Sequence, residues 1–216
     1  FFLFAKVSCL KIHDYLWFFK DSAMEKPNVS AFYKILINDL GFQPRAKQDI
    51  ALQQLAQFAV EGTNDDLFLL KGFAGTGKTT IISAFVKNLW KIRKSGVLMA
   101  PTGRAAKVIA NYSKREAFTI HKKIYFPKKS GASGIQFVLQ PNKHKNTIFI
   151  VDEASMIADH PGDSKNFDNG SLLDDLMEYV YSGHKCQLIF IGDTAQLPPV
   201  KMDMSPALDQ DKLRTG

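Results

Sequence analysis

Apolar and polar positions alternate along this chain in two different periods. From residue 44 to residue 62, Ala51, Leu55, Phe58 and Ala59 share one helical face, and Gly62 ends the pattern, so a helix is predicted there. Short apolar runs typical of buried strands occupy residues 67–70, 97–100, 148–151 and 188–191. Helical patterns separate these runs, through residues 82–89, 104–112 and 171–180. This alternation predicts an α/β domain with a mainly parallel sheet, whose ligands bind at the carboxyl ends of the strands.

Three segments depart from the alternation. Residues 122–146 hold the β-like run IQFVL between glycine-rich and polar stretches, which predicts a small β insertion. Residues 159–170 form a polar segment that we interpret as a loop. Residues 1–40 are interpreted as an N-terminal extension of unknown role, because charged residues interrupt their aromatic start and no signal-peptide pattern is present.

Composition excludes some classes of protein. The chain has 216 residues, of which 45% are hydrophobic, and its longest apolar runs are too short to cross a bilayer, so no membrane association is expected. Cys9 and Cys186 lie far apart without metal-ligand spacing, which is typical of reduced thiols in a cytoplasmic protein.

The positive charge is local. Residues 114–145 contain eight Lys or Arg residues and one acidic residue, Glu116, so this window holds the whole net charge of +7. A solvated loop and a contact with the phosphates of a nucleic acid are both open interpretations.

The segment LLKGFAGTGKTT, residues 69–80, has the spacing G-x-x-x-x-G-K-T between a predicted strand and a predicted helix. Glycines at these positions let backbone N–H groups approach phosphates, while Lys78 reaches the β- and γ-phosphates and the Thr79 hydroxyl binds Mg²⁺. The segment predicts a P-loop that binds ATP with Mg²⁺. Its candidate binding residues are Gly72, Gly75, Thr76, Gly77, Lys78, Thr79 and Thr80.

Two later strands end in polar residues that suit hydrolysis. Asp152 and Glu153 follow the run IFIV, where one carboxylate can hold Mg²⁺ together with Thr79 and the next can orient a water molecule. The last strand ends in IGDTAQLPPV, in which Gln196 has a donor and an acceptor that could sense the γ-phosphate. We therefore predict Lys78, Asp152, Glu153 and Gln196 as the catalytic set.

Together these motifs resemble those of superfamily 1 DNA helicases. GFAGTGKTT, APTGRAAKVI, TIHKKIY, IVDEAS and IGDTAQLPPV are similar to motifs I, Ia, Ib, II and III in that order, and PRAKQDIA is similar to the Q motif. The RecD-like and Dda-like branch is the nearest likeness. It implies a RecA-like ATPase domain over residues 41–216 and movement from 5′ to 3′ on single-stranded DNA.

The resemblance also implies roles for single residues. Gln48 would read adenine, and Asp193 would help couple Gln196 to the DNA side. The residues that would contact DNA are Pro101, Thr102, Arg104, Thr119, His121 and Lys122. A structural histidine whose hydrogen bonds are satisfied is the open alternative for His121.

In these helicases a small β domain between motifs Ib and II carries a pin that splits the duplex, so the insertion at about residues 122–146 is expected to be a pin. Phe126 or Phe137 would offer a stacking face, with a buried aromatic as the alternative. The expected partners are single-stranded DNA and duplex ends, with a nuclease complex as a further candidate.

The sequence ends soon after the third motif, so we interpret the chain as the N-terminal motor domain of a longer helicase that hydrolyses ATP poorly by itself. An ATP-regulated DNA-binding module without turnover and a P-loop kinase are the competing interpretations.

Overall fold

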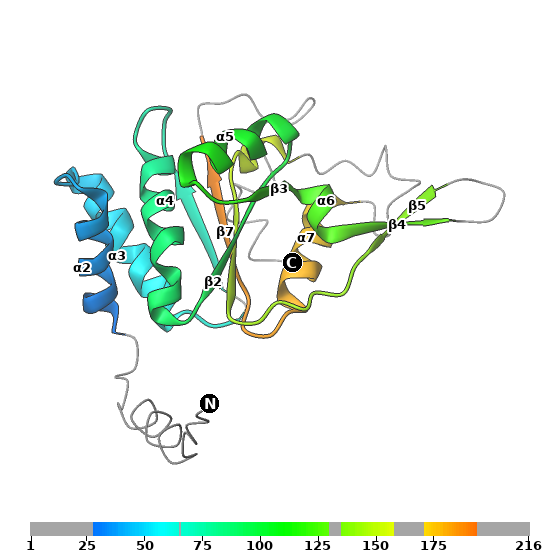
Figure 1. Cartoon of the computed structure of the whole chain (residues 1–216), viewed down its shortest axis with the longest axis horizontal. Helices are drawn as coiled ribbons and strands as arrows, with labels where there is room; N and C mark the ends of the chain where they lie inside the picture. Colours follow the sequence, from blue (N-terminus) through cyan, green and yellow to red (C-terminus); the bar gives the residue numbers. More distant parts are fainter. Residues whose placement is uncertain (1–27, 65, 130–134, 158–170, 194–216) are drawn as a thin grey trace, which may run out of the picture.

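Five parallel strands form the centre of the protein in a computed structural model, which describes residues 28–64, 66–129, 135–157 and 171–193 (Figure 1). Neighbouring strands follow the order β1, β7, β6, β2, β3. All four strand pairs are parallel. The bounds are β1 Leu67–Lys71, β2 Ser95–Ala100, β3 Ala117–Thr119, β6 Thr147–Val151 and β7 Gln187–Gly192. The predicted α/β fold of the P-loop class, with a mainly parallel sheet, is confirmed.

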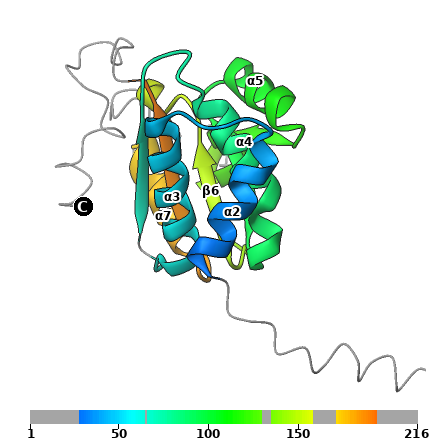
Figure 2. The ribbon, with the colours of Figure 1, turned by 90° about the vertical axis from the view of Figure 1, so that its left-hand side faces the viewer.

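Helices cover both faces of the sheet (Figures 1 and 2). One core packs α2 (Val29–Leu40), α3 (Ala46–Glu61), α4 (Lys78–Asn88) and α5 (Gly103–Ser113) against one face. The other core packs α6 (Ile120–Ile124) and α7 (Leu172–Tyr181) against the opposite face. Short 3-10 helices occupy Leu89–Ile92 (η1) and Ala154–Met156 (η3).

The central strands have no polar face. Ile148 and Ile150 of β6 belong to the first core, whereas Phe149 and Val151 belong to the second. Because successive side chains of a strand point to opposite faces, a strand covered on both sides must be apolar at every position. This requirement explains the unbroken run IFIV.

Helix α2 belongs to the core, although residues 1–40 were interpreted as an extension. Phe32 and Leu36 are fully buried against α3 and α4. Two polar contacts strengthen this packing: Lys87 of α4 forms a 2.5 Å ion pair with Asp39, and the Tyr33 hydroxyl donates to Asp49 of α3. The body of the domain therefore begins by residue 29 rather than at residue 41, and residues 1–27 lie outside the described part.

The predicted β insertion is a two-stranded antiparallel ribbon of β4 (Tyr125–Lys129) and β5 (Ile135–Leu139). It extends away from the sheet in Figure 1. The polar segment at residues 159–170 lies outside the described residues. Within the described part, no helix has the length and apolar character needed to span a membrane.

Candidate nucleotide and nucleic-acid site

The carboxyl ends of β1, β6 and β7 meet at one edge of the sheet, and each contributes one part of the site. The Gly72 amide at the end of β1 donates to the Gly192 carbonyl at the end of β7, at 3.2 Å. Beside them lies a cavity of about 430 Å³. Its lining includes residues 74–80 of the phosphate loop together with Asp152, Glu153, Gly192 and Asp193.

Glycine conformation shapes the phosphate loop. Gly75 and Gly77 have φ angles of 75° and 88°, in the left-handed region that L side chains rarely adopt. Gly77 is the N-cap of α4, so the helix begins at Lys78 with its amides directed toward the loop. The Lys78 ammonium donates to the carbonyl oxygen of Gly72 and, at 2.9 Å, to that of Phe73. The loop is thus folded around a cation, as binding of phosphates requires.

Gln48 joins the start of α3 to the same loop. Its side-chain oxygen accepts from the Arg45 amide at 3.0 Å, and its side-chain nitrogen donates to the Thr76 carbonyl at 2.9 Å. A Cβ atom on Gly77 would lie 2.6 Å from this nitrogen, so a side chain there would require the Gln48 side chain to move. The structure places Gln48 against the phosphate loop; its expected role in reading adenine stays a prediction.

Asp152 and Glu153 directly follow β6. The Asp152 amide donates to the Met99 carbonyl of β2 at 2.9 Å, and the Glu153 amide donates to the Asp152 carboxylate at 3.0 Å. Burial raises the pKa of Asp152, and the positive charge of Lys78 partly opposes the rise. Glu153 has a φ of 54°, which turns the chain sharply out of the strand. The second carboxyl group therefore lines the same cavity as the first.

The donor set of the cavity suits a magnesium ion. The Thr79 hydroxyl and the Asp152 carboxylate supply hard oxygen ligands, and Mg²⁺ usually combines one or two such ligands with phosphate oxygens and water. The described residues contain no cluster of three or more His, Cys, Asp or Glu residues that could hold a metal ion by themselves. The residues present therefore fit a Mg²⁺ ion that arrives with a nucleotide.

The proposed DNA-contacting residues follow β2 and β3, which are neighbours in the sheet. Ala100 of β2 pairs with Thr119 of β3, so the segments that leave these strands start side by side. Thr102 caps α5 by accepting from the Ala105 amide at 3.2 Å. A second depression of about 280 Å³ is lined by Thr102, Arg104, Ala105, Val108, Asp152, Glu153 and Met156. Pro101 lies in the turn between β2 and this helix.

The other predicted DNA residues surround the short helix α6. Thr119 caps this helix by accepting from the Lys122 amide at 3.3 Å, and the Lys122 ammonium lies 6.0 Å from the centre of the Phe118 ring. The His121 ring packs against Tyr125, with ring centres 5.9 Å apart, and burial lowers the pKa of His121. His121 is exposed and packs on an aromatic ring, which is compatible with a structural role as well as with a DNA contact.

Both candidate stacking residues of the ribbon are partly exposed, Phe126 at 40% and Phe137 at 38%. Phe126 pairs with Val138, whereas Phe137 pairs with Pro127, so the two rings project from opposite faces of the ribbon. The alternative of buried aromatics does not hold for either residue.

Sequence reasoning missed two residues of the nucleotide cavity, Val108 and Tyr112 of α5. Tyr112 is 69% exposed, and both residues lie away from the buried positions Ala106 and Ile109. The sequence signal that could have indicated them is an apolar pair four residues apart on the polar side of an amphipathic helix. The predicted sensor Gln196 lies outside the described residues.

Comparison with known proteins agrees with this geometry. Residues 54–202 match a family model described as an AAA domain. The chain is 32% identical to the ATP-dependent RecD2 DNA helicase of Deinococcus radiodurans over 62% of its length, and 31% identical to the ATP-dependent DNA helicase dda of Enterobacteria phage T4 over 61%. The RecBCD enzyme subunit RecD of Buchnera aphidicola is 32% identical over 63% of the chain.

The matched region spans only 16%, 28% and 24% of the lengths of these three relatives. The family match covers more than half of the chain, and it contains the phosphate loop and the strand ends that follow β2, β3, β6 and β7. The chain therefore belongs to the AAA domain family, as a motor domain of the RecD-like and Dda-like superfamily 1 helicase type.

Proposed function

We propose that this domain drives an ATP-dependent DNA helicase, coupling ATP hydrolysis to 5′ to 3′ movement on single-stranded DNA and to duplex unwinding. The observation that carries the proposal is the gathering of several functional parts at one edge of the sheet. There a phosphate loop and a carboxylate pair line one cavity, and the ends of β2 and β3 lie beside it. Because the matched region spans a third or less of the relatives' lengths, the activity is proposed for the full-length protein.

The residues of the cavity support hydrolysis of ATP. Lys78 exchanges the carbonyl oxygens of Gly72 and Phe73 for phosphate oxygens, which are stronger acceptors for an ammonium group. Thr79 and Asp152 would hold Mg²⁺, which neutralises charge on the phosphates. Glu153 accepts a proton from the attacking water, since it lines the cavity beside Asp152.

Coupling to DNA is supported by the way the two depressions adjoin. Val108, Asp152 and Glu153 line both of them, and Thr102 and Arg104 line the second. A change at the γ-phosphate that moves Glu153 therefore acts on the wall of the predicted DNA side. The α5 helix connects the two places, because Thr102 caps it and Tyr112 lies near its other end.

The proposed partners are single-stranded DNA and duplex ends. One relative is named as a subunit of the RecBCD enzyme, so membership of a nuclease complex is a further proposal. The basic window at residues 114–145 lies mainly on α6, the ribbon and the adjoining loops, which supports a contact with DNA phosphates there.

The test is steady-state ATP turnover of the full-length Glu153→Gln variant in the presence of oligo-dT. We expect ATP affinity to stay within about threefold and turnover to fall about 10²- to 10⁴-fold, since the amide cannot accept the proton. Glu61→Gln, which changes an exposed carboxylate at the far end of α3, should keep normal turnover.

Unchanged turnover in Glu153→Gln would contradict the hydrolysis mechanism. Turnover that ignores DNA but transfers phosphate to a small molecule would favour a kinase. ATP-dependent DNA binding without turnover in the parent protein would favour a DNA-binding module.

A further inference from the structure

A cavity among the described residues lies at the edge of the sheet opposite the phosphate loop. Its volume is about 510 Å³, larger than that of the nucleotide cavity. Lys94 precedes β2, Asn146 precedes β6, and Lys185 lies two residues before β7, so the cavity opens at the amino ends of the strands. The helicase mechanism uses none of these residues.

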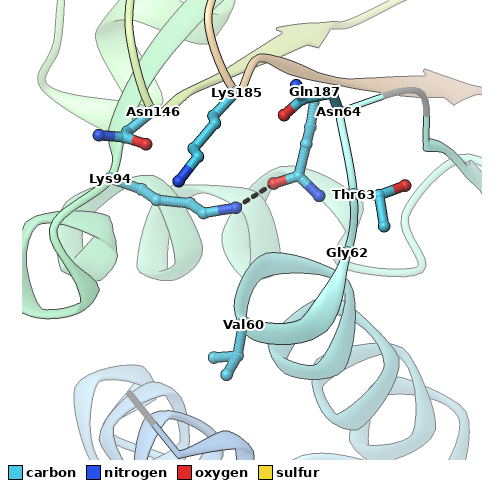
Figure 3. Close-up of a pocket in the computed structure, with 8 residues that line it drawn as sticks. All are labelled: Val60, Gly62, Thr63, Asn64, Lys94, Asn146, Lys185 and Gln187. Atoms are coloured by element: carbon cyan, nitrogen blue, oxygen red, sulfur yellow. Dashed lines mark hydrogen bonds between the residues drawn. The ribbon is translucent and has the colours of Figure 1, made fainter. Parts of the chain in front are cut away.

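Two lysine side chains converge on this cavity (Figure 3). The Lys94 ammonium donates to the side-chain oxygen of Gln187, which is 1% exposed, and Figure 3 shows the Lys185 side chain extending toward Lys94. Burial lowers the pKa of Lys94; Asp66 opposes the effect and Lys185 adds to it. Two cations in a partly desolvated place repel each other, and a bound anion would relieve the repulsion.

The cavity wall is fixed by hydrogen bonds. The Gln187 side-chain nitrogen donates to the Phe58 carbonyl at 3.0 Å, which orients the amide oxygen toward Lys94. The Ser95 amide donates to the Asn146 carbonyl at 3.0 Å, and the Asn146 amide donates to the His184 carbonyl at 2.9 Å. These bonds join the segments that precede β2, β6 and β7, so the cavity is formed before any ligand enters.

The backbone of these loops is also unusual. Asn146 and Lys185, which line the cavity, have φ angles of 49° and 55°, so two of the five non-glycine residues with positive φ in the described part of the chain lie in its wall. Such conformations cost about 1 to 3 kcal/mol each and gather at functional sites.

We propose that this cavity binds a compact phosphate-class anion, such as pyrophosphate or a small phosphate ester, between the ammonium groups of Lys94 and Lys185. The side-chain amides of Asn64 and Asn146 on the rim supply neutral donors. Lysine is a common partner of phosphate groups. The site lies across the sheet from the nucleotide cavity, so it is separate from the binding of ATP.

The test measures pyrophosphate binding by titration calorimetry in a Lys78→Ala background, which weakens the phosphate loop as a competing site. We expect one binding event, weakened at least tenfold by Lys185→Gln and by Lys94→Gln. Lys185 is exposed, so its substitution should leave the fold intact even if that of the partly buried Lys94 does not. Lys91→Gln, which removes an exposed lysine three residues from Lys94, should change affinity less than twofold.

Absence of pyrophosphate binding in the Lys78→Ala protein would overturn the proposal. So would equal affinity in Lys185→Gln and Lys91→Gln. A single-stranded oligonucleotide titrated into the same proteins identifies the source of the phosphate group. Loss of oligonucleotide binding in Lys185→Gln alone would assign the cavity to a nucleic-acid backbone, against the small anion that we propose.

Discussion

Replacing Gly77 by alanine should destabilise the protein through two separate effects. The first is conformational, because Gly77 has a φ of 88°, and an L residue in this region loses about 1 to 2 kcal/mol. The second is steric, because the new Cβ would lie 2.6 Å from the side-chain nitrogen of Gln48. The Gln48 side chain can move away, but it then loses its 2.9 Å hydrogen bond to Thr76, which contributes about 0.5 to 1.5 kcal/mol. We expect a total loss of about 2 to 3 kcal/mol in the free energy of unfolding.

Gly75 provides the matched control. Its φ is 75°, and a Cβ added there would meet nothing within 4 Å. Gly75→Ala should therefore show the conformational effect alone, and the difference between the two variants should be about 1 kcal/mol. In a Gln48→Ala background the steric effect disappears, so the two glycine substitutions should then cost about the same.

The assay is urea denaturation of the three single and two double variants, analysed as two double-mutant cycles. Calorimetric titration with ATP should show weaker binding for Gly77→Ala than for Gly75→Ala, because only the former displaces Gln48. Equal destabilisation by both glycine substitutions in the parent protein would refute the reasoning. So would a Gly77→Ala cost that does not change when Gln48 is removed.

Three further predictions concern other parts of the domain. Asp152→Asn should raise the melting temperature while abolishing ATP turnover. Burial raises the pKa of Asp152, so the ionised carboxylate destabilises the fold at pH values above this raised pKa. As the pH falls through the raised pKa, the melting temperature of the parent protein should approach that of the variant. Phe32→Ala should cost about 3 to 5 kcal/mol in urea denaturation, and exposed Phe42→Ala about 0.5 kcal/mol or less; equal costs would mean that α2 is not part of the core. Deleting residues 128–135 should reduce strand displacement and leave DNA-stimulated ATP turnover nearly intact, whereas equal loss of both would contradict the pin.

The parts of the fold that the sequence predicts well are those where burial dictates the pattern. Strands β6 and β7 are covered on both faces, so every position from Ile148 to Val151 and from Leu188 to Ile191 is apolar, and the predicted and observed strands agree to within a residue. Helix α4 and the start of η1 follow the same logic, because Ile82, Phe85 and Val86 of α4 and Leu89 of η1 are all buried.

Other elements were missed because their signals are short or depend on distant contacts. Strand β3 has three residues, all only partly buried, so no period is visible in it. Helix α2 does carry apolar residues at helical spacing, including Phe32 and Leu36, but their burial depends on α3 and α4, and the aromatic stretch before them obscured the pattern.

The candidate site divides in the same way. Phosphate-loop and carboxylate positions follow from local motifs at strand ends. Contacts between distant segments do not follow from local motifs. Examples are the hydrogen bond from Gln48 to Thr76 and the place of Tyr112 in the nucleotide cavity. The cavity between Lys94 and Lys185 joins residues about ninety positions apart, so no local motif could have indicated it.

The central claim is that the edge of the sheet around Lys78 hydrolyses ATP in response to DNA. The most direct test measures ATP turnover of the full-length protein with and without poly-dT, in the parent, in Lys78→Ala and in Lys71→Ala, which changes an exposed lysine at the end of β1. We predict strong stimulation by poly-dT in the parent and in Lys71→Ala, and none in Lys78→Ala. DNA-stimulated turnover that survives in Lys78→Ala would contradict the assignment of the site.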